Sequence, residues 1–176
     1  GLVRVNAERL NTLIQELIDF RRIETGNKQL KVSNVNISDV CLATYNAFID
    51  LAERNTIDYK SAIEPEISWN SDFSCLKKIL NNLVSNAFKY TPAGGTIEVG
   101  MNVVGERLNI YVYNTGKGLR EEDKKRIFNR YSVLDNVEES AIKGSSRNGL
   151  GLAICHSMVE LLGGKIDIDS EVGKYV

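Results

Sequence analysis

The chain opens with apolar residues spaced alternately four and three positions apart, which is typical of a helix with one apolar seam. The seam consists of Val3, Ala7, Leu10, Ile14 and Leu17, widened by Leu13, Ile18 and Phe20. We expect a helix over residues 3–23 that ends before Gly26, because glycine supplies a left-handed cap. A seam this wide favours a partner helix; the alternative is that it packs on the chain's own following domain.

After Gly26 the pattern changes to short strands and further amphipathic helices. Strands are expected at residues 29–32, 57–63, 67–69, 96–103, 108–113 and 165–169. Helices are expected at residues 39–54, 72–90, 121–128 and 150–162. A turn at Glu64-Pro65 predicts that 67–69 returns alongside 57–63 as a hairpin. Residues 174–176 have the pattern of a strand that has only begun.

These elements predict an α+β fold, a two-layer α/β sandwich whose mixed sheet carries helices on one face. The long first helix precedes this sandwich as a separate element. We therefore divide the chain into residues 1–26 and a domain over residues 27–176. A length of 176 residues suits one domain with such an appendage.

Composition narrows the possible partners. Lys and Arg total 22 against 23 Asp and Glu, so the net charge of -1 argues against a nucleic-acid partner. Cys41, Cys75 and Cys155 are scattered without a CxxC pair, which indicates reduced thiols rather than disulfides or a zinc site. No apolar run reaches the roughly 18 residues of a membrane span, so we expect a soluble chain, although its parent could be membrane-anchored.

Three polar residues share one face of the expected helix at 72–90. Asn82, Asn86 and Lys89 are four and three positions apart, beside the apolar seam. Asparagine is a mediocre helix former, so its repetition indicates a function. An amide oxygen suits Mg²⁺, and a lysine one turn on can neutralise phosphate. Taken alone, these residues are explained better by a solvated polar face.

A glycine-containing turn follows the expected strand at 108–113. Its sequence, NTGKG, begins at Asn114 and places Gly116 and Gly118 two positions apart. Glycine lets the backbone approach a ligand closely and adopt positive φ angles. An ordinary strand-to-loop turn explains the same residues.

A second glycine pair stands where a long aperiodic stretch meets the expected helix at 150–162. Gly149, Leu150 and Gly151 would open that helix, where unpaired N–H groups attract anions, and Arg147 adds positive charge nearby. The preceding residues 132–148 form a loop that is long for a compact domain, which is typical of a lid or binding element.

The order of the motifs is more specific than any one of them. NNLVSNAFKYTP, NTGKG, IFNRY and NGLGLAI follow one another in the chain, and GxxxxGK[ST] is absent. From about Asn36 onward the chain resembles the ATP-binding domain of sensor histidine kinases, within the Bergerat-type ATPase family that includes DNA gyrase and MutL. The opening stretch RLNTLIQELIDFRRIETG resembles the second helix of the kinase dimerisation hairpin.

The resemblance implies an ATP and Mg²⁺ site with the following roles. Asn86 would ligate the metal, Asn82 would lie close to the phosphates, and Lys89 would contact phosphate. These three would be the catalytic residues. Further nucleotide contacts are implied for Tyr90, Asn114, Gly116, Gly118, Leu119, Arg147, Gly149, Leu150 and Gly151.

Three departures from the family pattern refine this interpretation. Hydrolytic relatives have glutamate where Asn82 stands, and an amide cannot act as the general base, which favours phosphoryl transfer over hydrolysis. Asn114 stands where aspartate is usual; its Oδ1 still accepts a hydrogen bond, so adenine binding should persist with lower affinity. The single histidine, His156, follows the GLGL motif and is not the expected phosphoacceptor.

The implied function is the ATP-binding catalytic part of a two-component sensor histidine kinase. It would transfer the γ-phosphoryl group to a histidine on the dimerisation helix, outside this sequence, for relay to a response-regulator aspartate. The implied partners are the dimerisation helix in a homodimer and a receiver domain, in the cytosolic part of a membrane-anchored sensor. In isolation the fragment should be inactive, and its last strand is expected to be truncated. The alternative, supported by Asn114, is a degenerate, non-catalytic dimerisation and nucleotide-sensing module.

Overall fold

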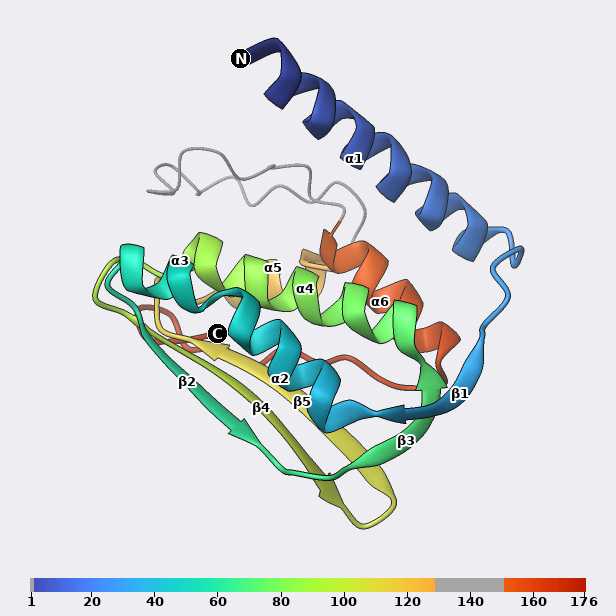
Figure 1. The fold of residues 1–176 in the computed structure, drawn as a ribbon. Helices are drawn as coiled ribbons and strands as arrows, with labels where there is room; N and C mark the ends of the chain where they lie inside the picture. The colour runs from blue at the N-terminus through green and yellow to red at the C-terminus, as the bar shows by residue number, and fades with distance from the viewer. Residues whose placement is uncertain (1, 129–150) are drawn as a thin grey trace.

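The computed structural model describes residues 2–128 and 151–176, and it arranges them as a helical layer over a sheet (Figure 1). The helices are α1 (Leu2–Glu24), α2 (Ile37–Ala47), α3 (Ile49–Arg54), α4 (Phe73–Tyr90), α5 (Glu121–Arg126) and α6 (Gly151–Leu161). The strands are β1 (Val32–Asn36), β2 (Asp58–Ile63), β3 (Ser68–Asp72), β4 (Thr96–Val104) and β5 (Arg107–Asn114). The predicted α+β sandwich with helices on one face is confirmed.

The strands form two sheets among the described residues. β4 lies between β2, which is parallel to it, and β5, which is antiparallel to it. β1 and β3 form a separate antiparallel pair. The parallel pairing of β2 and β4 requires a long crossover, and that crossover includes α4.

The predicted hairpin between residues 57–63 and 67–69 is wrong, because β3 pairs with β1 and not with β2. The N–H of Ile67 donates to Ser38 Oγ (2.9 Å), and its carbonyl accepts from the N–H of Ile37 (2.8 Å). Ser38 Oγ also donates to the carbonyl of Glu64 (2.7 Å). The chain after the turn is thus bound to the start of α2, which directs it away from β2.

Two other predicted boundaries are also wrong. The helix expected at 39–54 is divided at Phe48 into α2 and α3, and the Phe48 ring stacks on Phe88 of α4 with ring centres 5.4 Å apart. The strand expected at 29–32 begins only at Val32, where its pairing with Asp72 starts.

Residues 165–169 form no strand either. Their exposure alternates as it would in a strand, but no other part of the described chain pairs with them, and a strand requires such a neighbour. In contrast, Tyr175 forms a bridge to Thr115, and Val176 exchanges backbone hydrogen bonds with Asn114. Residues 174–176 thus form no named strand: Tyr175 makes only isolated bridges, and Lys174 belongs to a turn.

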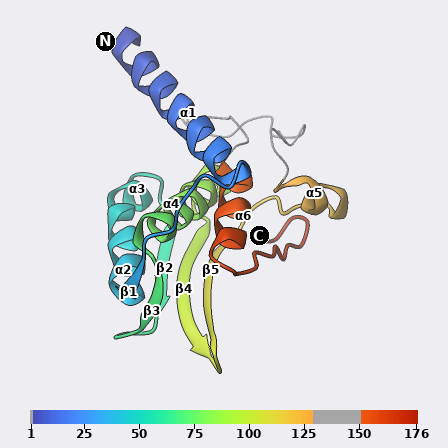
Figure 2. The same cartoon turned by 90° about the vertical axis from the view of Figure 1, so that its right-hand side faces the viewer.

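Helix α4 lies at the centre of the core. One side of it packs Leu76 and Leu80 with residues of α2, β1 and β4, and another side packs Cys75 and Ile79 against α6. Because apolar residues cover these sides, the polar residues of α4 are left to the remaining face. Figure 2 shows α4 and α6 adjacent above the sheet.

The first helix meets this domain only near its C-terminal end, as far as its side chains are described. Phe20 is buried among α4 and α6 residues, and Asp19 forms an ion pair with Lys78. Leu10 and Ile14 of the seam are exposed, Leu10 at 59%. The last turns of α1 therefore pack on the chain's own domain, as the alternative prediction had it, while much of the apolar seam further toward the N-terminus is exposed.

Asp72 connects the start of α4 to the segment before β1. Its Oδ1 accepts from the N–H of Cys75 (3.0 Å), and its Oδ2 accepts from the N–H of Lys31 (2.7 Å). Burial by itself would raise the pKa of this carboxyl, but the hydrogen bonds from these backbone groups outweigh burial and hold the pKa below its ordinary value.

We predict that Asp72→Ala lowers the free energy of unfolding by about 1–2 kcal/mol, because the helix loses its N-cap. Asp72→Asn keeps a capping oxygen and should cost less at neutral pH. Since the folded-state pKa lies below the unfolded one, the carboxylate stabilises the fold fully above about pH 4, and this contribution is lost as pH falls through the folded-state pKa. Urea unfolding at several pH values measures both effects. An unchanged pH slope in Asp72→Asn would contradict the assignment.

Candidate functional site

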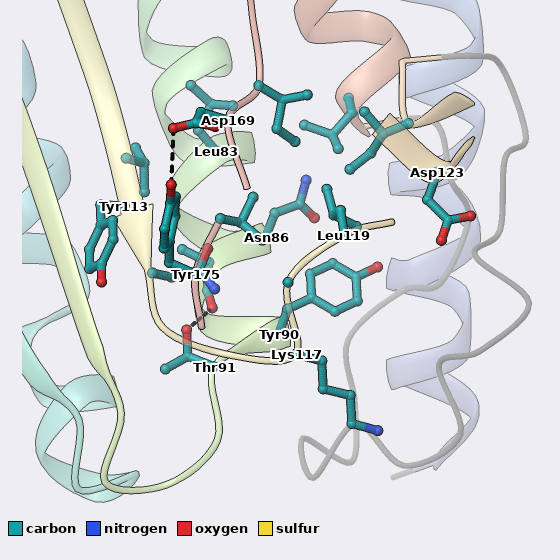
Figure 3. Close-up of a pocket in the computed structure, with 18 of the residues that line it drawn as sticks. Leu83, Asn86, Tyr90, Thr91, Tyr113, Lys117, Leu119, Asp123, Asp169 and Tyr175 are labelled. Carbon is teal, nitrogen blue, oxygen red and sulfur yellow. Dashed lines mark hydrogen bonds between the residues drawn. The ribbon is translucent and has the colours of Figure 1, made fainter. Parts of the chain in front are cut away.

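A cavity of about 800 Å³ lies between α4, β5, the loop that follows β5, and the C-terminal segment (Figure 3). Its size lies within the range of small-molecule sites, and its walls combine apolar side chains with a few polar groups. Among the predicted site residues, those on its wall are Asn86, Lys89, Tyr90, Asn114, Gly118 and Leu119.

Helix α4 presents its polar face to this cavity. Asn86 points into it (Figure 3), and no group in the described ranges 2–128 and 151–176 hydrogen-bonds its carboxamide. Lys89 Nζ lies 5.2 Å from the centre of the Tyr90 ring, a cation–π distance that places a positive charge beside an aromatic face. Thr91, the residue after the end of α4, donates its Oγ1 hydroxyl to the carbonyl of Ala87 in the last turn of the helix (2.6 Å).

Asn82 lies one turn earlier and is not on the cavity wall. Its Nδ2 donates to the carbonyl of Gly151 at 3.5 Å, so it connects α4 to the first residue of α6. A Cβ on Gly151 would lie 3.6 Å from Asn82 Oδ1, an ordinary contact, and Leu152 is the α6 residue that lines the cavity. The catalytic role of Asn82 therefore remains a prediction.

The end of β5 and the loop that follows it supply two buried residues of the site, one polar and one apolar. Asn114 is only 6% exposed, and its Nδ2 donates to the carbonyl of Thr115 (3.3 Å). This contact orients the amide, because a carbonyl can receive only the NH₂ end, and it leaves Oδ1 as the acceptor. Leu119 is also buried, and its N–H donates to Ser170 Oγ (2.8 Å).

The two glycines of the loop permit close approach of the chain to itself. Gly118 has a φ of +66°, and a Cβ there would collide with the backbone of Glu171. A Cβ on Gly116 would lie 2.9 Å from the carbonyl of Tyr90, and Gly116 is not on the cavity wall. The sequence suggested that these glycines admit a ligand; the structure gives them contacts within the chain that shape the cavity.

Several wall residues were not predicted from the sequence. Asp123 is buried and accepts from Arg120 Nε (2.8 Å). Tyr175 donates its hydroxyl to Asp169 (3.2 Å), and this hydrogen bond raises the pKa of the tyrosine. Lys117, within the NTGKG motif, also lines the cavity. Of these residues, only Lys117 belongs to a motif that the sequence analysis singled out. Asp123, Asp169 and Tyr175 reach the cavity through tertiary packing, which no local pattern indicates.

Arg147, Gly149 and Leu150 lie outside the described residues, as does the predicted lid at 132–148.

Within the described residues no cluster of three His, Cys, Asp or Glu groups could hold a metal. The single amide of Asn86 nevertheless fits Mg²⁺, because that ion keeps several waters and binds through few protein oxygens together with substrate phosphates. Among the helices in residues 2–128 and 151–176, none is both long and apolar enough to cross a membrane.

Comparison with known proteins defines the family. Residues 71–176 match the family described as histidine kinase-, DNA gyrase B-, and HSP90-like ATPase, and the chain belongs to this family. It is 29% identical to the sensor histidine kinase YcbM of Bacillus subtilis, over 97% of this chain and 54% of YcbM. It is 31% identical to the sensor protein GacS of Pseudomonas syringae pv. syringae, over 99% of this chain and 20% of GacS. The chain thus spans about half of YcbM and a smaller part of GacS.

Solved structures support the same fold. Full-length ShkA in complex with AMPPNP superimposes with a TM-score of 0.84 at 24% identity, covering 99% of this chain and 35% of ShkA. The Acinetobacter baumannii histidine kinase AdeS gives a TM-score of 0.77 at 20% identity, covering 96% of this chain and 76% of AdeS. At these identities the likeness concerns the fold alone.

We predict that Gly118→Ala destabilises the protein more than Gly105→Ala. Both glycines have positive φ, so each alanine costs about 1–2 kcal/mol of backbone strain. A Cβ at Gly105 meets nothing within 4 Å, whereas one at Gly118 must displace the backbone of Glu171. Urea unfolding of the two variants measures the difference. Equal losses would show that the loop does not depend on this close approach.

Proposed function

We propose that the cavity binds Mg-ATP and that this chain is the ATP-binding catalytic part of a two-component sensor histidine kinase. The observation that carries the proposal is the convergence of the Asn86 carboxamide and the buried Asn114 amide on one cavity, in a member of this ATPase family. The AMPPNP complex of ShkA, whose fold this chain shares, supports a nucleotide as the ligand.

The two amides would divide the recognition of the nucleotide. Asn114 Oδ1 would accept from the exocyclic amine of adenine, and Leu119 would pack against the base. At the other end, Asn86 would provide an amide oxygen for Mg²⁺, and Lys89 would add positive charge near the phosphates. A bound Mg²⁺ would neutralise phosphate charge and orient the γ-phosphoryl group.

We propose phosphoryl transfer to a histidine of the dimerisation helix rather than hydrolysis. The Asn82 amide cannot take a proton from water, whereas an imidazole nucleophile attacks through its own nitrogen lone pair. Catalysis would then consist mainly of positioning and charge neutralisation. His156 is not the nucleophile in this proposal, because its ring packs against Phe128 (5.6 Å) and its Nδ1 lies 3.6 Å from Glu160.

The proposed partners follow from the same assignment. The exposed seam of α1, with Leu10 and Ile14, would pack against dimerisation helices in a homodimer. The phosphoryl group would pass to an aspartate of a receiver domain; ThkA, which shares this fold, has been solved in complex with the response regulator protein TrrA. We place the chain in the cytosol of a membrane-anchored bacterial sensor, where Mg-ATP is available and its three buried free cysteines would remain reduced.

We predict that Asn86→Ala weakens Mg-ATP binding by at least about tenfold, because the site loses an oxygen that contacts a charged ligand. Asn81→Ala is the matched control, since Asn81 belongs to the same helix and does not line the cavity. Titration calorimetry measures both affinities. The proposal fails if wild-type protein shows no Mg-ATP binding, or if both variants bind as the wild type does.

We predict acid-labile phosphorylation of a histidine when a dimerisation helix that carries one is joined ahead of α1. Radiolabel from γ-labelled ATP should reach that histidine in the Asn81→Ala protein and be lost in Asn86→Ala. His156→Ala should leave the label in place. Nucleotide binding without any label would favour the non-catalytic sensing module, and release of free phosphate as the main product would favour an ATP-driven clamp.

A further inference from the structure

Asn114 combines a fixed backbone with a side-chain amide that can present either of its two ends to the cavity. Its backbone lies at the end of β5 in register with Ile97 of β4, and the residue is only 6% exposed. The amide is held by one contact, from Nδ2 to the carbonyl of Thr115, whose 3.3 Å is longer than a typical N–H···O hydrogen bond. No group in residues 2–128 and 151–176 donates to Oδ1. The chain therefore fixes where the amide lies but holds its orientation weakly.

A half-turn of this amide has a small cost. The torsion that turns the amide plane is roughly twofold, and the nitrogen and oxygen are similar in size, so both orientations occupy the same space. The half-turn breaks the hydrogen bond to Thr115 and sets Oδ1 beside the Thr115 carbonyl. Loss of a neutral hydrogen bond of this kind corresponds to a factor of roughly ten to thirty. A ligand that needs the donor end can therefore turn the amide over.

The two orientations of the amide suit two classes of purine. This inference rests on the proposed function, in which Asn114 faces position 6 of the base. With Oδ1 toward the base, the amide accepts from the 6-amino group of adenine. With Nδ2 toward the base, it donates to the 6-oxo oxygen of hypoxanthine or guanine. A carboxylate at this position would have no donor for that oxygen and would repel it, so an amide and a carboxylate select differently.

We propose that Asn114 is a specificity-determining residue through which the cavity accepts 6-oxopurine nucleoside triphosphates as well as ATP. A 6-oxo base binds roughly ten- to thirtyfold more weakly than adenine, because it has to break the contact between Asn114 and the Thr115 carbonyl. A carboxylate in the same place would reject such a base by a factor of roughly a hundred or more, because an oxygen would face a negative charge with no proton between them. The site therefore prefers adenine without excluding the other class.

The test measures the affinities of Mg-ATP and of the magnesium complex of inosine triphosphate (Mg-ITP) by titration calorimetry. Inosine carries the 6-oxo group without the 2-amino group of guanine. Asn114→Asp removes the donor, and Asn114→Leu removes donor and acceptor at similar volume. Leu119→Ala is the control, since it shortens an apolar wall residue and leaves the amide intact. A pH of about 8 keeps the introduced carboxyl ionised, and comparing affinity ratios between proteins cancels the difference between the bases at N1.

We expect wild-type protein to bind Mg-ITP roughly ten- to thirtyfold more weakly than Mg-ATP, and Asn114→Asp to raise that ratio at least tenfold by weakening Mg-ITP. Asn114→Leu should weaken both nucleotides, and Leu119→Ala should keep the wild-type ratio. The proposal is overturned by Mg-ATP binding without Mg-ITP binding, by an unchanged ratio in Asn114→Asp, or by unchanged Mg-ITP affinity in Asn114→Leu, which decides alone if Asn114→Asp does not fold. Absence of Mg-ATP binding to the wild type contradicts the proposed function instead, so the two failures are distinguishable.

Discussion

Burial of the apolar sides of α4 is the constraint on which the rest of the structure depends. This helix packs on α2 and β4 in one direction and on α6 in another, and its side chains belong to all three clusters of the core. Each buried aliphatic side chain contributes about 1.5–3 kcal/mol, so rotation of the helix about its axis would be costly. The orientation of the helix therefore determines where Asn86 and Lys89 can point.

The cavity exists because neighbouring segments approach α4 at its polar face without filling it. Gly116 lets the loop after β5 pass the end of α4, and Gly118 lets it pass the turn at Glu171. Asn114, two residues before Gly116, is buried with its amide oriented by the Thr115 carbonyl. Asn114 thus presents an oriented amide acceptor on the cavity wall, which is consistent with a binding site at this position.

Periodicity predicted the long elements well because their patterns arise within the elements themselves. The apolar seam of α4 and the alternation of β5 depend only on residues within each element. The sequence therefore predicted both elements and most of their bounds. The failures involve pairing. Residues 67–69 were expected beside β2, yet the Ser38 hydroxyl and the start of α2 hold Ile67. Residues 165–169 have the alternation of a strand, but no other described residues pair with them.

The sequence by itself determined the class of fold, the helix that carries Asn86 and Lys89, and the turn that carries Asn114, because these depend on residue spacing and glycine placement along short stretches. Only the tertiary structure decided which residues share the cavity. It placed Asn82 against Gly151 and not on the wall, and it brought Asp123, Asp169 and Tyr175 to the wall. The physical reason is that a cavity is defined by contacts between segments distant in the chain, and local periodicity contains no record of those contacts.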